Sequence, residues 1–236
     1  AKDYDTSISI ENIPENLTAL GHVNDEMVLD FPRGTQIGTL LHRYFEKVPF
    51  AQLAEKENIE KLCQDLNLAE EQFAAVQQWF AQILSPPILP NNDLTLAQIN
   101  EKQCLKELAF YLNISSHFDV AGFNRALASL HHLPSEPLQF DDIQGMVRGT
   151  MDLVFSYQDK YYLLDYKSNF LGEALKDYDQ AALKKAMLEH HYDWQYLLYV
   201  VALHRYLKTR LPHYDYNRDF GGVVYAFLRG MNGTPQ

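Results

Sequence analysis

Residues 145–167 read GMVRGTMDLVFSYQDKYYLLDYK and carry the most regular structural signal in the chain. Two alternating or apolar runs, residues 145–155 and 161–167, lie on either side of the polar pair Gln158-Asp159. Runs rich in Val, Leu, Phe and Tyr around a short polar loop are typical of a β-hairpin. We therefore predict two antiparallel strands here.

The length of the hairpin loop decides which residues face each other. A loop of two residues (158–159) or of four (157–160) places Asp152 directly opposite Asp165. A loop of three would shift the partner by one residue and turn it to the other face. Like charges directly opposite each other destabilise a sheet. A cation held between the two carboxylates would remove that conflict.

Lys167 follows Asp165 by two residues, so it returns to the same face of its strand, about 6.6 Å further along. Carboxylates hold hard divalent cations, and such cations activate water and neutralise a phosphate, while a Lys can orient the water. Two carboxylates and a lysine on one face are the side chains that metal-assisted hydrolysis of a phosphodiester bond needs. Because a D-x-K pattern also arises by chance, the alternative is a surface ion pair of small energy.

The remaining sequence predicts an α/β fold with a mixed sheet covered by helices. Apolar residues recur at helical or strand spacing along most of the chain. We expect helices at residues 36–47, 51–66, 69–84, 119–131, 177–189 and 194–209, and further strands at residues 103–114 and 222–228. Thr35 is expected to cap the first helix. The last strand is almost wholly apolar, which favours burial on both faces.

The 236 residues are expected to form a single domain with three parts. Residues 1–35 are broken by prolines and form an irregular lead-in. Residues 36–100 form an inserted helical part, and residues 101–236 form the sheet core with the hairpin. Since the chain begins without Met and ends in a loose polar stretch, we expect it to be a piece of a longer protein.

The composition excludes several classes of protein. A hydrophobic fraction of 47% is enough for a buried core, and no run is long and apolar enough to span a membrane. Two cysteines without a metal or disulfide pattern, and a first segment unlike a signal peptide, favour the cytoplasm. The net charge of −11 argues against binding of nucleic acid by bulk charge alone, although a partner could deliver it.

Four further side chains could complete a site. Glu107 on the strand before the hairpin could supply a third carboxylate, and His42 on the first helix could supply an imidazole ligand. Gln195 and Tyr199 are four residues apart on a helix, so they share a face and could contact a phosphate or a base. The structural alternatives are a solvated glutamate, a histidine paired with Glu46, a surface glutamine and a core tyrosine.

Asp152 and the run Asp165-Tyr166-Lys167, followed by the Q-x-x-x-Y pattern of residues 195–199, resemble the PD-(D/E)xK nuclease superfamily. The likeness covers nearly the whole chain and is closest to the nuclease domains of bacterial helicase–nuclease subunits. It implies a restriction-endonuclease-like core, with a central mixed β-sheet flanked by helices. Met replaces the nominal Pro of the motif, and that Pro is not a ligand.

The resemblance also implies a role for individual residues. It assigns catalytic roles to Asp152, Asp165 and Lys167, metal ligation to His42, Asp152, Asp165 and the backbone carbonyl of Tyr166, and supporting or DNA contacts to Glu107, Gln195 and Tyr199. The implied cofactor is Mg²⁺, with Mn²⁺ as a substitute, because imidazole suits softer cations better than Mg²⁺.

The activity implied by the resemblance is that of a metal-dependent exodeoxyribonuclease. Its substrate would be single DNA strands delivered by a helicase portion of the same subunit and by two partner subunits, in double-strand-break repair, recombination and degradation of linear foreign DNA. One alternative is a catalytically silent nuclease fold that guides DNA or binds partner subunits, and another is a hydrolase of small phosphoesters. The intact Asp152, Asp165 and Lys167 argue against the silent fold.

Overall fold

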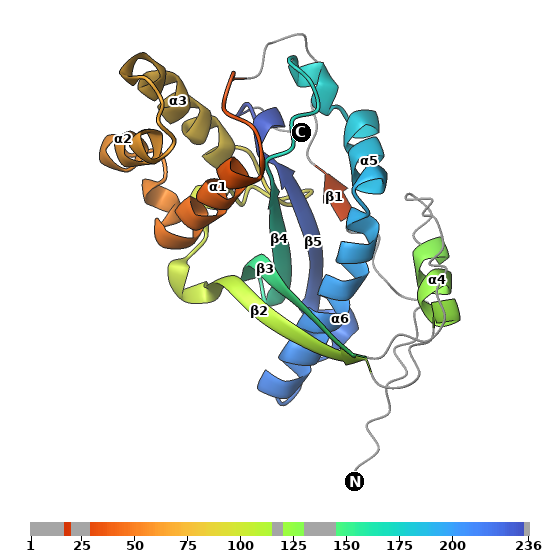
Figure 1. Ribbon diagram of the computed structural model, residues 1–236. Coiled ribbons are helices and arrows are strands. Elements are labelled where there is room, and N and C mark those ends of the chain that lie inside the picture. The colour runs from red at the N-terminus through yellow and green to blue at the C-terminus, as the bar shows by residue number, and fades with distance from the viewer. Residues whose placement is uncertain (1–16, 20–28, 115–119, 130–144, 234–236) are drawn as a thin grey trace.

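The computed structural model describes residues 17–19, 29–114, 120–129 and 145–233. Within them, five strands form one mixed sheet in the order β1-β5-β4-β3-β2 (Figure 1). Strands β1, β5 and β4 run parallel to one another, whereas β4, β3 and β2 pair antiparallel. This arrangement confirms the predicted α/β class and the mixed sheet.

The elements follow the predicted order with small shifts at their ends. The strands are β1 (Leu17–Ala19), β2 (Cys104–Ile114), β3 (Gly145–Tyr157), β4 (Lys160–Lys167) and β5 (Phe220–Phe227). The helices are α1 (Thr35–Lys47), α2 (Lys56–Asp65), α3 (Phe73–Leu84), α4 (Val120–Ser129), α5 (Gln180–Glu189), α6 (Tyr192–Arg210) and α7 (Tyr216–Asp219). In the described ranges, no helix combines the length and the apolar character needed to cross a membrane.

The hairpin forms with the two-residue loop. Pairing runs from Tyr157–Lys160 to Leu153–Leu164, which confirms the predicted register over this stretch. Both loop residues, 158–159, have positive φ angles of 48° and 60°. A type I′ turn requires this left-handed backbone, and its twist matches the twist of the flanking strands.

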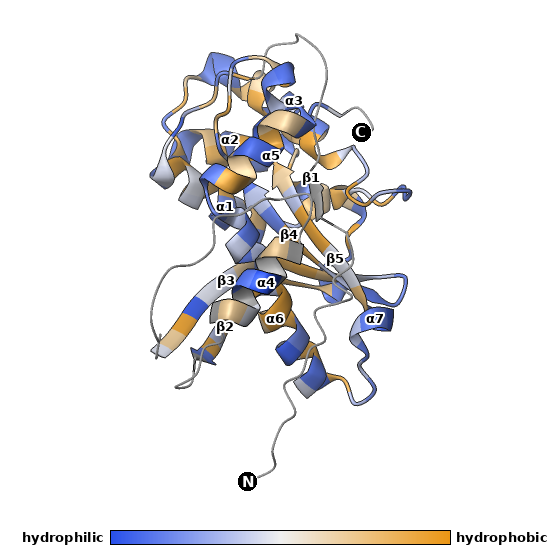
Figure 2. Ribbon diagram, turned by 90° about the vertical axis from the view of Figure 1, so that its right-hand side faces the viewer, coloured by the Kyte–Doolittle hydropathy of each residue, from blue (hydrophilic) through white to orange (hydrophobic). Residues whose placement is uncertain are grey.

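Two apolar layers cover the two faces of the sheet. Val224 and Ala226 of β5 face the layer shared with α1, α2 and α3, while Val223 and Tyr225 face the layer shared with α5 and α6. All of β5 is buried, as the apolar run predicts. In Figure 2 most of β5 is orange, the colour of hydrophobic residues. Helices therefore pack on both faces of the sheet, and a functional site can form at the strand ends and loops.

The lead-in contains a strand that the sequence pattern does not predict. Leu17–Ala19 form β1 and pair in parallel with β5, beginning with Leu17 opposite Val223. Three residues carry too little periodicity to be recognised, and their conformation depends on the edge that β5 offers. Residues 1–16 and 20–28 of the lead-in lie outside the described residues.

The cap predicted for the first helix is wrong. Gly34 occupies the N-cap position with a φ of 111°, and no side chain caps the helix. Thr35 is instead the first helical residue. The chain enters the helix through a backbone conformation that favours glycine, so a side-chain cap at the next residue is not used. Of the helix predicted at 119–131, the described part is the helix α4.

The buried side chain of Arg229 links the segment before α1 to the segment after β4. Its guanidinium donates to the backbone carbonyls of Phe31 (3.0 Å), Pro32 (2.6 Å) and Ser168 (3.0 Å). These carbonyls lie just before α1 and just after β4. Because buried carbonyls without a donor cost free energy, the guanidinium stabilises both junctions. One junction leads to His42 and the other follows Lys167, so Arg229 positions two of the predicted site residues.

Candidate active site

At Glu107 and Asp152, the two-stranded ribbon of β2 and β3 reverses which of its faces points to which apolar layer. Leu153 packs in the layer next to α1–α3, whereas Met151 packs in the layer next to α6. Residues two apart on a regular strand share a face, so the strand must turn between them. Across from Asp152, Glu107 has a φ of 51°. This left-handed conformation costs about 1–3 kcal/mol in a residue with a side chain, and such strain is concentrated at functional sites.

Backbone pairing between β3 and β4 also stops next to Asp152. The last pair is Leu153–Leu164. One step further, the backbone N–H of Tyr166 donates to Oδ2 of Asp152 at 2.7 Å, so a side-chain carboxylate replaces a backbone acceptor. The predicted direct cross-strand pair of Asp152 and Asp165 is therefore wrong. The strands separate one residue before it, and this separation makes room for side chains from other elements.

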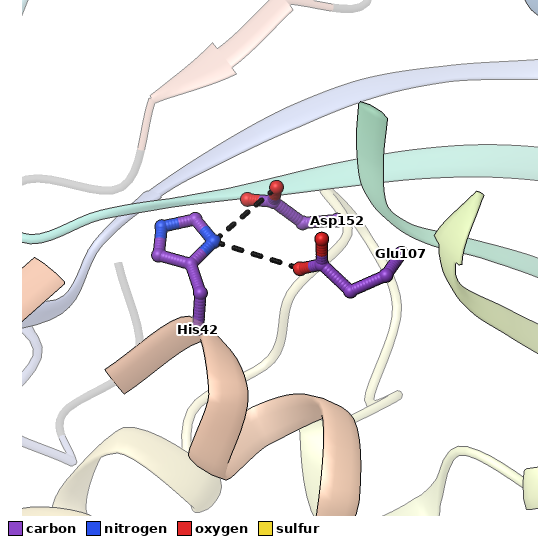
Figure 3. Close-up of side chains that lie close together, drawn as sticks. All are labelled: His42, Glu107 and Asp152. Carbon is purple, nitrogen blue, oxygen red and sulfur yellow. Dashed lines mark ion pairs between the residues drawn. The ribbon is translucent and has the colours of Figure 1, made fainter. Parts of the chain in front are cut away.

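His42, Glu107 and Asp152 bring three ligand atoms together (Figure 3). Nδ1 of His42 lies 3.4 Å from Oδ1 of Asp152 and 3.8 Å from Oε1 of Glu107. Within the described residues, this is the group of His and carboxylate side chains whose ligand atoms all lie within 4.8 Å of one another. The predicted candidates from α1, β2 and β3 thus meet in one place.

The charges of this cluster fit a cation. Burial lowers the pKa of the His42 imidazole, but the hydrogen bond and the negative charge of Asp152 outweigh it, and the net pKa is raised. Burial and the charge of Asp152 likewise raise the pKa of Glu107. His42 and Glu107 therefore hold a proton more tightly than the isolated side chains would. A divalent cation between the ligands would replace those protons and stabilise the ionised carboxylates.

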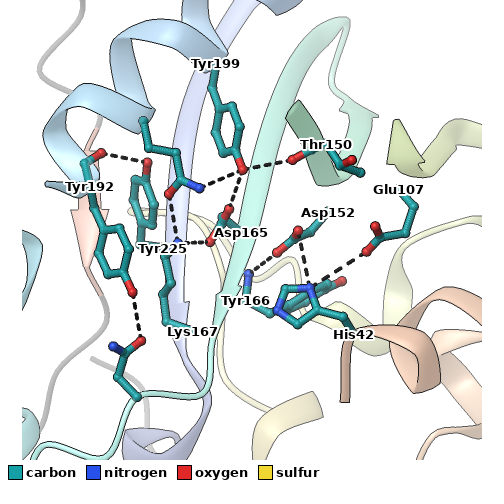
Figure 4. Close-up of polar contacts among 12 residues, drawn as sticks. His42, Glu107, Thr150, Asp152, Asp165, Tyr166, Lys167, Tyr192, Tyr199 and Tyr225 are labelled. Carbon is teal, nitrogen blue, oxygen red and sulfur yellow. Dashed lines mark hydrogen bonds and ion pairs between the residues drawn. The ribbon is translucent and has the colours of Figure 1, made fainter. Parts of the chain in front are cut away.

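Asp165 and Lys167 form a second, more deeply buried cluster beside the first (Figure 4). Nζ of Lys167 lies 2.5 Å from Oδ1 of Asp165 and donates to Oε1 of Gln195 at 2.8 Å. Nε2 of Gln195 donates to the hydroxyl of Tyr199 at 2.8 Å, and that hydroxyl lies 2.9 Å from Oδ2 of Asp165. The two strand residues and the two helix residues therefore form one closed network.

The surroundings of Asp165 raise the pKa of its carboxyl group. Burial and the charge of Asp152 raise its pKa to about 6, although Lys167 and Tyr199 lower it. Its Oδ1 makes the ion pair with Lys167 but no well-aligned hydrogen bond. A carboxylate oxygen with spare acceptor capacity, next to two carboxylates and an imidazole, fits a hard divalent cation.

Two tyrosines hold the Lys167 ammonium in place. Nζ lies 3.7 Å from the ring centroid of Tyr192 and 5.2 Å from that of Tyr225, within the range of cation–π attraction. The Tyr225 hydroxyl donates to the backbone carbonyl of Tyr192, and the Tyr192 hydroxyl donates to Asn169 Oδ1, both at 3.1 Å. Sequence reasoning missed both tyrosines, because no spacing links them to Lys167 and the chain has 15 tyrosines.

The ring of Tyr166 packs between Phe45 and His42. It stacks on Phe45 with a centroid distance of 4.3 Å and meets the His42 ring edge to face at 6.2 Å. Its backbone N–H donates to Asp152. Metal ligation by its backbone carbonyl stays a prediction.

The chain matches the family model of the PD-(D/E)XK nuclease superfamily over residues 17–234. It belongs to this superfamily. This confirms the resemblance seen in the sequence, which rests on the superfamily's motif of carboxylates and a lysine. The order Asp152, then Asp165 and Lys167, follows that motif along the hairpin.

This chain matches a part of each of two longer relatives. The protein is 57% identical over 236 residues to the RecBCD enzyme subunit RecB of Haemophilus influenzae, covering all of this chain and 19% of the relative. It is 41% identical over 206 residues to RecB of Escherichia coli, covering 86% of this chain and 17% of the relative. The chain thus spans about a fifth of the length of these relatives.

Replacing Tyr199 by Phe is expected to slow metal-dependent phosphodiester cleavage about tenfold and to move the acidic limb of its pH profile upwards. The hydroxyl stabilises ionised Asp165, so its loss raises the pKa of that carboxyl further, and more of it is protonated at a given low pH. The measurement is the rate of cleavage from pH 5 to 9. Tyr206→Phe on the same helix is the control, and an unshifted profile in Tyr199→Phe would contradict the prediction.

Proposed function

We propose that this chain is the nuclease domain of a RecB-like subunit, and that it hydrolyses phosphodiester bonds of DNA with the help of a divalent cation. One observation carries the proposal. His42, Glu107 and Asp152 converge beside the buried Asp165–Lys167 pair, in a chain of the PD-(D/E)XK nuclease superfamily. Every catalytic group expected from the sequence is therefore close to the others.

The cation would be held by His42, Glu107, Asp152 and Asp165, with the backbone carbonyl of Tyr166 as a further ligand. We propose Mg²⁺, because carboxylate oxygens dominate this set, and Mn²⁺ as a substitute, because an imidazole takes part. When bound, the cation lowers the pKa of water and neutralises the charge of the scissile phosphate.

The side chains around Lys167 prepare it for catalysis. Its ammonium has three N–H donors, and the structure engages it with Asp165 and Gln195. A remaining donor can orient an attacking water or stabilise the negative charge that develops on a phosphate oxygen. Gln195 and Tyr199 act as positioning residues, because they fix the lysine and Asp165 relative to each other.

The resemblance to the nuclease domains of helicase–nuclease subunits suggests how the substrate arrives. We propose that a helicase portion of the same subunit, with RecC-like and RecD-like subunits, delivers single strands of unwound DNA to this domain. The site would then act as an exodeoxyribonuclease in the cytoplasm, in double-strand-break repair, recombination and the degradation of linear foreign DNA. The net charge of −11 agrees with delivery by partners, because the chain does not attract DNA by bulk charge.

The proposed function is tested with end-labelled single-stranded DNA. We expect degradation by this chain in Mg²⁺, none in EDTA, and none by Asp165→Ala. Asp65→Ala, which removes an exposed carboxylate at the end of α2, is the matched control and should cleave normally. Cleavage that persists in Asp165→Ala would disprove the assigned site. A chain that binds the cation without cleaving DNA would instead be a silent nuclease fold.

A further inference from the structure

From Leu108 to Asn113 of β2, and from Met146 to Met151 of β3, one face of the ribbon packs on α6 and the other face is exposed. The side facing α6 carries residues that pack against that helix or are largely covered, among them Phe110, Leu112 and Met151. The other side is here called the outer ribbon face, and its residues are all exposed: Ala109, Tyr111, Asn113, Met146, Arg148 and Thr150. In Figures 1 and 2 the ribbon projects away from α1, α2 and α3.

The outer ribbon face combines aromatic, flexible apolar and cationic side chains. Tyr111 is 66% exposed and Met146 is 67% exposed, which is unusual for large apolar side chains. Tyr111 lies directly opposite Arg148 in the register of the ribbon. Arg148 takes part in no ion pair within the described residues. Such a guanidinium beside an exposed ring is conspicuous in a chain with excess negative charge.

This face continues the candidate metal site. On the regular part of the ribbon, every second residue shares a face, so Tyr111 and Ala109 of β2 and Arg148 and Thr150 of β3 form one row that leads toward Glu107 and Asp152. His42 comes from α1 and meets both carboxylates, which agrees with a position on the side away from α6. Four residues at about 3.3 Å each separate Tyr111 and Arg148 from the carboxylates by about 13 Å. About four stacked nucleotides of one strand span that distance.

The inner face of the ribbon makes the outer face rigid. Phe110 contacts Tyr199 of the catalytic network edge to face, with a centroid distance of 5.9 Å. Its ring lies against Gly149, where an added Cβ would come within 2.5 Å of the ring. The ribbon therefore packs closely on α6, and the side chains of the outer ribbon face are presented from a fixed backbone.

We propose that the outer ribbon face binds single-stranded nucleic acid next to the scissile phosphate, with Tyr111 stacking on a base and Arg148 pairing with a phosphate. This inference rests on the proposed nuclease function. Stacking platforms combined with cations are the usual means of holding single strands without sequence preference. An unpaired strand fits better than a duplex, because only an unpaired base offers its face to a ring.

The first test is binding of a fluorescent oligothymidylate, followed by anisotropy in EDTA so that no cleavage occurs. Tyr111→Ala is expected to weaken binding about tenfold or more, while Tyr111→Trp retains it, because stacking needs an aromatic face. Arg148→Gln is expected to reduce the slope of log K against log salt by about 0.7, the value for one phosphate contact on a single strand. Lys160→Gln, an exposed cation at the far end of the hairpin, is the matched control.

The second test separates this inference from the proposed function. Tyr111→Ala should raise the KM for an oligonucleotide but leave cleavage of a small chromogenic phosphodiester unchanged, because the small ester does not reach Tyr111. Normal oligonucleotide binding and KM in both variants, with an active parent chain, would overturn the inference and leave this face for a protein partner. A parent chain that cleaves neither substrate would instead disprove the proposed function, and the inference with it.

Discussion

Replacing Asp152 by Asn is expected to abolish binding of the divalent cation and to lower the rate of DNA cleavage about a thousandfold or more. The carboxylate lies with His42 and Glu107 in the candidate metal cluster. Lewis-acid catalysis contributes several kcal/mol, and each 1.36 kcal/mol changes the rate tenfold. The loss of one negative ligand should therefore remove both the cation and most of the rate.

The same substitution should leave the metal-free protein folded. The Asn side chain still offers an oxygen to the backbone N–H of Tyr166, and the variant loses a negative charge that raises the pKa of Asp165. We expect the free energy of unfolding without metal to change little. The measurement is the shift of Tm with Mn²⁺ concentration, because a ligand that binds only the folded state stabilises it.

Asp159→Asn in the hairpin loop is the control for this experiment. It is also an Asp→Asn change, but its side chain is exposed and lies at the far end of the hairpin from the site. It should keep the metal-dependent shift of Tm and full cleavage. An Asp152→Asn variant that still shows the parent's shift of Tm would contradict metal ligation by this residue.

Replacing Lys167 by Ala is expected to preserve binding of the cation but to lower the cleavage rate by a factor of about 100 to 10,000. The lysine is 7% exposed and its ammonium lies between Asp165, Gln195 and the Tyr192 ring, so no water or other side chain takes over its position easily. Positioned donors and acid–base groups supply rate factors of this size. The measurement pairs calorimetric titration with Mn²⁺ and single-turnover cleavage.

The pH of this experiment matters for its interpretation. Lys167 lowers the pKa of Asp165, so its removal raises that pKa above the value of about 6 in the parent chain. At pH 8 the carboxyl should still ionise when the cation binds, whereas at pH 6 competition by the proton would weaken binding. Lys160→Ala, at the other end of the same strand, is the control. Retained cleavage in Lys167→Ala at pH 8 would disprove the catalytic role.

Local patterns were enough for the hairpin and for the buried last strand. Alternation along residues 145–155 and the polar pair at 158–159 specify two antiparallel strands, and the two-residue loop sets their register up to Leu153–Leu164. The apolar run in β5 likewise predicted that this strand is buried on both faces. These features depend on neighbours in the sequence, so a sequence pattern can report them.

Local patterns could suggest, but could not establish, the convergence of His42 and Glu107 on Asp152. The three residues lie on α1, β2 and β3, and only packing of these elements brings their side chains within reach. The left-handed backbone of Glu107 has no signal in the sequence, because nothing in a strand pattern marks a glutamate for this conformation. The cap at Thr35 failed for a related reason, since the chain enters α1 through Gly34.

Local sequence patterns were sufficient to predict four of the five strands, the order of the main helices along the chain, and the carboxylates and lysine of the hairpin. Packing between distant segments determined that β3 pairs with β4 only from Leu153 onward. It also brought Asp152 to His42 and Glu107, and Asp165 and Lys167 to Gln195 and Tyr199. The physical reason is that strand pairing follows from periodicity and turn geometry along the chain. The separation of two strands and the approach of a helix depend on packing between segments that are far apart in sequence.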